Sequence, residues 1–222
     1  MPGLRQRPDP VFADRRDAGR RLAELLHARE RSLVVALPRG GVPVGFEVAR
    51  SLGLPLDVLA VRKLGAPHNP ELAVGAIAEG GASVLDRRIA LGAAVTPASL
   101  QATIARETLE LHRQAELFRD GRAPLDTSGR GVIVVDDGLA TGLTMLAAVR
   151  ALRDQGAAAV TVAVPVGASE SVEQLRRECG AVICHTPTAN LLAVGLWYRD
   201  FTPVGDEEVT ALLRQSQAAA RA

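Results

Sequence analysis

Two adjacent acidic residues, Asp136 and Asp137, stand between an apolar run and a short stretch of small residues. The apolar run, residues 131–135, has the composition of a strand that is buried on both faces. The small-residue stretch, residues 138–142, leads into a segment whose apolar spacing predicts a helix. Open α/β sheets bind ligands at the carboxyl ends of their strands, where the two carboxylates would lie. This edge of the predicted sheet is therefore the first candidate for a functional site.

The residues after the acidic pair are suited to hold a phosphate. Backbone N–H groups at the start of a helix have no partner within the helix and attract anions. Gly138, Ala140 and Gly142 allow this backbone to approach a ligand closely, and Thr141 and Thr144 add hydroxyl donors. Because carboxylates repel phosphate, the acidic pair is expected to face sugar hydroxyls or a hydrated cation instead.

Other motifs for phosphate binding and catalysis do not fit the sequence. A P-loop requires a lysine between its last glycine and the Ser or Thr, and Leu143 stands there. The dinucleotide fingerprint needs three glycines at fixed spacing and has no acidic pair before them. The sequence contains neither a Gly-x-Ser-x-Gly elbow nor a His-Glu-x-x-His helix.

Composition limits the class of protein further. The 222 residues are 47% hydrophobic, which is enough for a core and excludes a disordered chain. A formal net charge of +1 argues against a general nucleic-acid binder. No apolar run approaches the roughly 20 residues of a membrane span, and no secretory signal is recognisable. With only two cysteines, Cys179 and Cys184, a reducing cytoplasm is the expected compartment.

The order of predicted elements indicates one α/β domain with a parallel sheet. Strands are expected at 32–37, 56–61, 131–135, 159–165 and 181–185, and helices at 14–29, 42–52, 144–155, 169–177 and 205–215. Two short strands, 73–78 and 83–85, are expected around the turn Gly80-Gly81. A long helix, 97–118, is expected to begin after Thr96 as its N-cap.

Residues 132–144, VIVVDDGLATGLT, resemble the phosphoribosyl-pyrophosphate (PRPP) signature of type I phosphoribosyltransferases. Residues 37–42 resemble the pyrophosphate loop of that family, and residues 61–63 a basic pair that also meets pyrophosphate. Residues 194–201 resemble the segment that frames the base in several members. Taken together, these segments resemble the group of predicted bacterial phosphoribosyltransferases whose base is not assigned.

The resemblance implies a parallel-sheet, Rossmann-like α/β core with a small irregular hood. Residues 1–222 would form a single phosphoribosyltransferase domain, with the core at about 14–185 and hood pieces from about 64–96 and 186–222. It also implies a homodimer that binds PRPP and a small-molecule base. The composition adds the expectation of a cytoplasmic protein that binds neither nucleic acid nor membrane. The helix expected at 97–118 stands where some members have only a short flexible loop. Which segment would cover the site as a lid is therefore left undecided.

The implied reaction is a Mg²⁺-dependent transfer of the ribose 5-phosphate group of PRPP to a nitrogenous base, with release of pyrophosphate. Asp136 and Asp137 would meet the ribose hydroxyls directly or through Mg²⁺. The 5-phosphate would be held by Gly138, Leu139, Ala140, Thr141, Gly142 and Thr144. Pyrophosphate would be bound by Arg39, Gly40, Gly41, Arg62 and Lys63. Lys63, the one lysine among 26 basic residues, would be catalytic together with the two acids.

Several alternatives remain open at this level. Trp197 and Tyr198, the only Trp and Tyr, could stack on a base or pack together in the core. Asp200 could help to hold a metal ion. Asp137 could be only a helix cap, residues 39–41 only a turn, and the basic pair only a solvated one. The same fold could also serve a non-catalytic regulator that senses PRPP or a nucleotide, or a hydrolase that uses water in place of a base.

Overall fold

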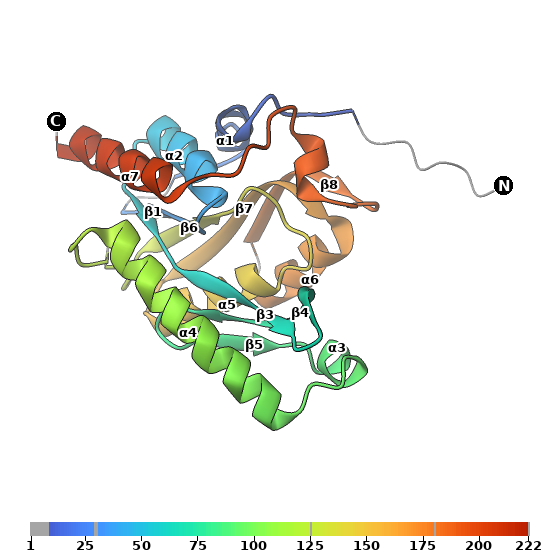
Figure 1. The fold of residues 1–222 in the computed structure, drawn as a ribbon. Helices are drawn as coiled ribbons and strands as arrows, with labels where there is room; N and C mark the ends of the chain where they lie inside the picture. The colour runs from blue at the N-terminus through green and yellow to red at the C-terminus, as the bar shows by residue number, and fades with distance from the viewer. Residues whose placement is uncertain (1–8, 29–30, 125, 180, 222) are drawn as a thin grey trace.

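A five-stranded parallel sheet forms the centre of the computed structural model (Figure 1). The structure describes residues 9–28, 31–124, 126–179 and 181–221. The sheet has the order β2-β1-β6-β7-β8, with β1 at Leu33–Ala36, β2 at Leu56–Val58, β6 at Gly131–Val135, β7 at Ala159–Ala168 and β8 at Ala181–Thr188. All four neighbouring pairs are parallel, which confirms the fold class predicted from the sequence.

Helices cover both faces of this sheet. One face carries α1 (Arg15–Ala23), α2 (Gly41–Leu52) and α7 (Asp206–Arg221), and the other carries α5 (Leu143–Asp154) and α6 (Ser169–Cys179). Because side chains alternate along a strand, Ile133 and Val135 pack with the first group of helices, while Val132 and Val134 pack with the second. The near-continuous apolar composition of β6 follows from this coverage on both faces.

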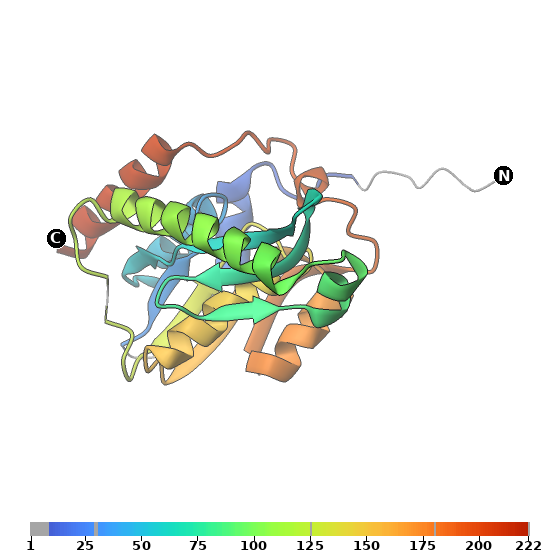
Figure 2. The ribbon, with the colours of Figure 1, turned by 60° about the horizontal axis from the view of Figure 1, so that its bottom comes forward.

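A second, antiparallel sheet packs on the outer side of α5 (Figures 1 and 2). Its strands are β3 (Val61–Ala66), β4 (Asn69–Ala78) and β5 (Ser83–Leu85), in the order β3-β4-β5. The long helix α4 (Pro97–Arg119) lies across its other face, next to the short helix α3 (Arg87–Gly92). This part of the chain is more regular than the sequence indicates.

The prediction of a single strand at 56–61 is wrong. Strand β2 ends at Val58, and β3 begins at Val61 in the other sheet. The chain leaves the parallel sheet at this point because Arg62 and Lys63 follow, and a strand covered on both faces cannot accept their charges. The sequence also places the end of the first helix too late, since α1 ends at Ala23.

Other local predictions are confirmed. Asp14 caps α1 by accepting a hydrogen bond from the Asp17 amide at 2.7 Å. Thr96 and Ser99 form a capping box at the start of α4, with each side chain accepting from the amide of the other. In the described ranges, none of the helices combines the length and the apolar character that crossing a membrane would need.

The strand order reverses between β1 and β6, the two strands that precede the candidate site. Strand β1 leads through α2 to β2 on one side, whereas β6 leads through α5 to β7 on the other. Such a reversal leaves room for a ligand beyond the carboxyl ends of the two strands. Residues 37–41 and 136–142 leave the sheet at this position.

Candidate functional site

The loop after β1 and the loop after β6 touch each other directly. A Cβ atom on Gly40 would lie 2.0 Å from Asp137 Oδ2, and one on Gly41 would lie 2.8 Å from the Val135 carbonyl oxygen. Both distances are shorter than those that real Cβ atoms show, so a side chain at either position would force its neighbours to shift. The structure therefore brings the predicted pyrophosphate loop against the predicted ribose-binding acids.

The two carboxylates of the acidic pair have different partners. Asp136 Oδ1 accepts a hydrogen bond from the Asp137 amide at 2.8 Å. Asp137 Oδ2 accepts one from Arg15 Nε, also at 2.8 Å. Burial and the nearby charge of Asp137 raise the pKa of Asp136 well above its usual range. Burial also raises the pKa of Asp137, against the opposing effect of the Arg15 guanidinium.

This arrangement fits a hydrated divalent cation or the hydroxyls of a sugar. Two partly buried carboxylates offer hard oxygen ligands, and Arg15 is the one cation paired with either of them among the residues described. The described residues contain no group of three or more His, Cys, Asp or Glu side chains that could hold a metal ion. A Mg²⁺ ion here would take its remaining ligands from water and substrate, as this ion commonly does.

The loop at residues 138–142 is held by hydrogen bonds to β7 and α6. The Leu139 amide donates to the Val166 carbonyl at 2.9 Å, and the Ser171 hydroxyl donates to the Ala140 carbonyl at 2.5 Å. Gly142, at the N-cap of α5, has a φ of 77°, a conformation that favours glycine. The hydrogen bonds recorded for the described residues leave the amides of residues 140–142 without an acceptor. Those amides can therefore serve an anion.

The predicted basic residues are engaged elsewhere. Arg39 Nε forms an ion pair with Asp206 Oδ1 of α7 at 2.9 Å. Arg62 and Lys63 line a cavity of about 340 Å³ between β3 and α4. Arg62 donates twice to Glu107, and Lys63 Nζ lies 3.1 Å from Glu71 Oε2. Within the described ranges, no ion pair joins Arg62 or Lys63 to the acidic pair.

Tyr198 is part of the support of the acidic pair. Its side chain is buried, and its hydroxyl donates to the Asp137 carbonyl at 2.6 Å. Its ring lies between Phe12 and Phe201, at centroid distances of 5.4 and 5.0 Å. This packing favours the core alternative for Tyr198 over stacking on a base. Trp197 joins the same cluster but is only partly buried.

Arg15 is the residue beside the acidic pair that the sequence does not reveal. It is buried in the first turn of α1, and its Nη1 donates to the Thr202 carbonyl at 2.9 Å. Its guanidinium lies 3.8 Å from the centre of the Phe201 ring. It is one of 25 arginines, and neither its neighbours nor its spacing distinguishes it. Only its contact with Asp137 in the structure distinguishes it from the other arginines.

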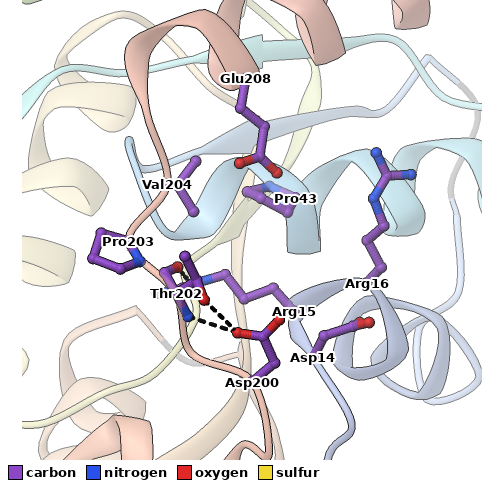
Figure 3. Close-up of a pocket in the computed structure, with 9 residues that line it drawn as sticks. All are labelled: Asp14, Arg15, Arg16, Pro43, Asp200, Thr202, Pro203, Val204 and Glu208. Atoms are coloured by element: carbon purple, nitrogen blue, oxygen red, sulfur yellow. Dashed lines mark hydrogen bonds between the residues drawn. The ribbon is translucent and has the colours of Figure 1, made fainter.

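Arg15 also lines a cavity of about 220 Å³ between α1, α2 and the segment before α7 (Figure 3). The Arg15 side chain runs toward Thr202, and the Asp200 carboxylate is bonded to the Thr202 amide and hydroxyl. Asp200 lies on this cavity and is exposed. It does not join Asp136 and Asp137 in a cluster of metal-binding side chains within the described part of the chain.

Comparison with known proteins identifies the family. Residues 14–195 match the family model described as "Phosphoribosyl transferase domain". A Mycobacterium tuberculosis H37Rv protein named "Putative phosphoribosyl transferase" is 46% identical over 205 residues, which cover 91% of this chain and 46% of that protein. The chain thus spans about half the length of this curated relative. The uracil phosphoribosyltransferase of Streptomyces griseus is 44% identical over 70 residues, or 32% of this chain and 33% of that protein.

A solved structure supports the same assignment. The crystal structure of the protein TT1426 from Thermus thermophilus is similar to this chain with a TM-score of 0.77 and 44% sequence identity. The match covers 92% of this chain and 98% of that one. The resemblance of the sequence to the phosphoribosyltransferase family is therefore confirmed over most of the chain. The chain belongs to the phosphoribosyl transferase domain family.

Proposed function

We propose that this protein is a Mg²⁺-dependent phosphoribosyltransferase that moves the ribose 5-phosphate group of PRPP onto a nitrogenous base and releases pyrophosphate. The contact of Gly40 with Asp137 carries the proposal. Through this contact, the loop suited to pyrophosphate and the acids suited to ribose share one edge of the sheet. Family membership supports PRPP as the donor.

The 5-phosphate is held by the start of α5. The amides of residues 140–142 have no acceptor among the described residues, and Thr141 is exposed. Thr144, in the first turn of α5, adds a second hydroxyl. Free amides and the positive end of the helix dipole together favour a dianionic phosphate.

The pyrophosphate is held by the loop after β1. The recorded hydrogen bonds leave the amides of Arg39 and Gly40 without an acceptor in the described chain, whereas Gly41 N donates to Leu37 O at 3.0 Å. Arg39 is 46% exposed at its side chain and can exchange Asp206 for a phosphate. In the same way, Arg62 would leave Glu107 and Lys63 would leave Glu71 to pair with the pyrophosphate. Cations and amides placed here would stabilise the charge that develops on the leaving group.

Asp136 and Asp137 would hold Mg²⁺ or the ribose hydroxyls. When bound, the cation would neutralise part of the charge of the departing pyrophosphate. The two acids would orient the sugar while its anomeric carbon gains positive character, as in other glycosyl transfers. A nitrogen atom of the base would form the new bond at that carbon as the bond to pyrophosphate breaks.

The base-binding region is the least specified part of the site. Tyr198 is buried and packs against Phe12 and Phe201, so Trp197 is the aromatic side chain left to frame a base. Its Nε1 is buried and has no hydrogen-bond partner among the described residues. We also propose that the protein acts in the cytoplasm as a homodimer, with residues 1–222 as one domain.

The test is Mg²⁺·PRPP binding by calorimetry, for the natural chain and for the double variant Asp136→Asn/Asp137→Asn. We expect binding to be lost in the variant and kept in Asp120→Asn, an exposed acid paired with Arg214. A panel of bases would then be scored by release of pyrophosphate.

The outcomes separate the competing functions. Release that depends on a base supports the transferase, and release without a base indicates hydrolysis. Binding with no release under any condition indicates a regulator that senses PRPP. A natural chain that does not bind Mg²⁺·PRPP at all would refute the proposal.

A further inference from the structure

We propose that Arg15 is a positioning residue for the acidic pair, which holds Asp137 so that only Oδ1 is open to the ligand. This proposal rests on the proposed function, because it specifies how Asp137 meets the sugar or cation. It assigns a role to a residue outside every segment that resembles the PRPP signature or the pyrophosphate loop.

The first observation is that Asp137 Oδ2 is enclosed. Arg15 Nε donates to it at 2.8 Å, and the two side chains are 10% and 16% exposed, for Arg15 and Asp137 respectively. A Cβ on Gly40 would lie only 2.0 Å from the same oxygen and 3.3 Å from Oδ1, so the Gly40 backbone is in close contact with Oδ2. Among the described residues Oδ2 receives the Arg15 hydrogen bond and Oδ1 receives no recorded donor, so Oδ1 is the oxygen left to meet a ligand.

The second observation is that the backbone of Asp137 is held independently. The Tyr198 hydroxyl donates to the Asp137 carbonyl at 2.6 Å, and the Asp137 amide donates to Asp136 Oδ1. With its carbonyl, its amide and Oδ2 all engaged, the residue has little freedom to turn its carboxylate. Such fixed placement avoids reorganisation when the ligand binds.

The third observation is that Arg15 is itself fixed. Its guanidinium spans two acceptors, Asp137 Oδ2 and the Thr202 carbonyl, and lies over the Phe201 ring. A planar fork can serve both acceptors at once, whereas the ammonium group of lysine is a single point of charge. Arg15 thereby links α1, the segment before α7 and the loop after β6 at one carboxylate.

The test uses three substitutions in α1. R15M removes the guanidinium at similar length, R15K keeps the charge but not the fork, and R20M is the control. Arg20 lies on the same helix, is 48% exposed at its side chain, and reaches its carboxylate partners only at 3.9 and 4.0 Å. Calorimetry with Mg²⁺·PRPP gives the affinity, and circular dichroism verifies the fold.

We expect R15M to fold and to bind Mg²⁺·PRPP at least tenfold more weakly, while R20M binds within twofold of the natural chain. R15K should recover part of the loss, since it restores charge beside Asp137. If Arg15 served only the stability of the fold, R15M would keep its affinity for Mg²⁺·PRPP whenever circular dichroism shows it folded. Unchanged affinity in folded R15M would overturn the proposal.

A second measurement involves no ligand and keeps the proposal testable if R15M is unstable. Melting temperatures are compared for R15M, D137N and the double variant. Because the two side chains form one buried pair, the double variant should lose less than the sum of the single losses. Additive losses would overturn the proposal. Failure of the natural chain to bind PRPP would overturn the proposed function instead, and this cycle would still decide on Arg15.

Discussion

Glu107 on α4 accepts two hydrogen bonds from Arg62 on β3, at 2.9 and 2.8 Å. The Glu107 side chain is only 12% exposed. The helix that carries it stands where some members of the family are expected to have a short loop. Through this one carboxylate, the long helix is connected to a residue predicted to bind pyrophosphate. The ion pair therefore competes with the proposed ligand for Arg62.

Glu107→Gln should strengthen the binding of pyrophosphate. The change leaves the helix intact and removes the charge that holds Arg62, which becomes free to meet the ligand. For a partly exposed pair we expect a gain of about fivefold, on the order of 1 kcal/mol. Calorimetry with pyrophosphate measures it. Glu110→Gln is the control, because Glu110 pairs with Arg113 on the same helix. Weaker binding in Glu107→Gln would contradict the competition.

Gly40→Ala should weaken PRPP binding strongly while the fold survives. The added methyl group would collide with Asp137 Oδ2, so either the acid or the loop must shift. Overpacking of this kind costs about 1–3 kcal/mol of stability. We expect a fall in affinity of at least about 20-fold, of the same order as that strain. Gly92→Ala is the matched control, since a Cβ at Gly92 meets nothing within 4 Å. Equal affinity in the two variants would argue against the contact.

Tyr198→Phe should destabilise the chain and weaken PRPP binding a few-fold. The hydroxyl bonds the Asp137 carbonyl, and its loss leaves that acceptor without this donor. The expected loss in the free energy of unfolding is about 1–3 kcal/mol, measured with denaturant. Stacking on a base needs only the ring, which phenylalanine keeps. A variant as stable as the natural chain, with unchanged PRPP binding and unchanged use of the base, would argue against the hydroxyl contact and would instead favour stacking.

Cys184 should react with alkylating agents only at high pH. Burial raises the pKa of the Cys184 thiol to about 11, so the reactive thiolate is rare at pH 8. Its rate should rise about tenfold for each pH unit between 8 and 10, because the thiolate fraction does so far below the pKa. The reaction is followed by mass spectrometry in the variant Cys179→Ser, in which Cys184 is the remaining cysteine. A plateau below pH 9 would show that the thiol is not shielded by burial.

Sequence alone was sufficient for the segments whose signals are local. The apolar run before Asp136, the small residues after Asp137 and the helix that follows all lie within residues 131–155. Each part is specified by its own composition, and Gly142 supplies the left-handed conformation that the turn into α5 uses. The capping box at Thr96 is equally local. Predictions of this kind need no knowledge of which strands are neighbours.

Strand order, by contrast, is a property of the whole chain. The site depends on β1 and β6 lying side by side with Ala36 opposite Val135, and no local signal specifies that pairing. The same pairing sets Gly40 against Asp137. The break between β2 and β3 was also missed, because the apolar run continues across it.

Long-range side-chain contacts were beyond the sequence altogether. Arg15 meets Asp137 across 122 positions, and Tyr198 meets it across 61. Arginine is common in this chain, and a tyrosine beside a tryptophan suggests a base as readily as a core. Composition and spacing thus predict which chemistry the acidic loop can perform. Only the tertiary structure decided which side chains hold that loop in place, because burial and partners are set by packing between distant segments.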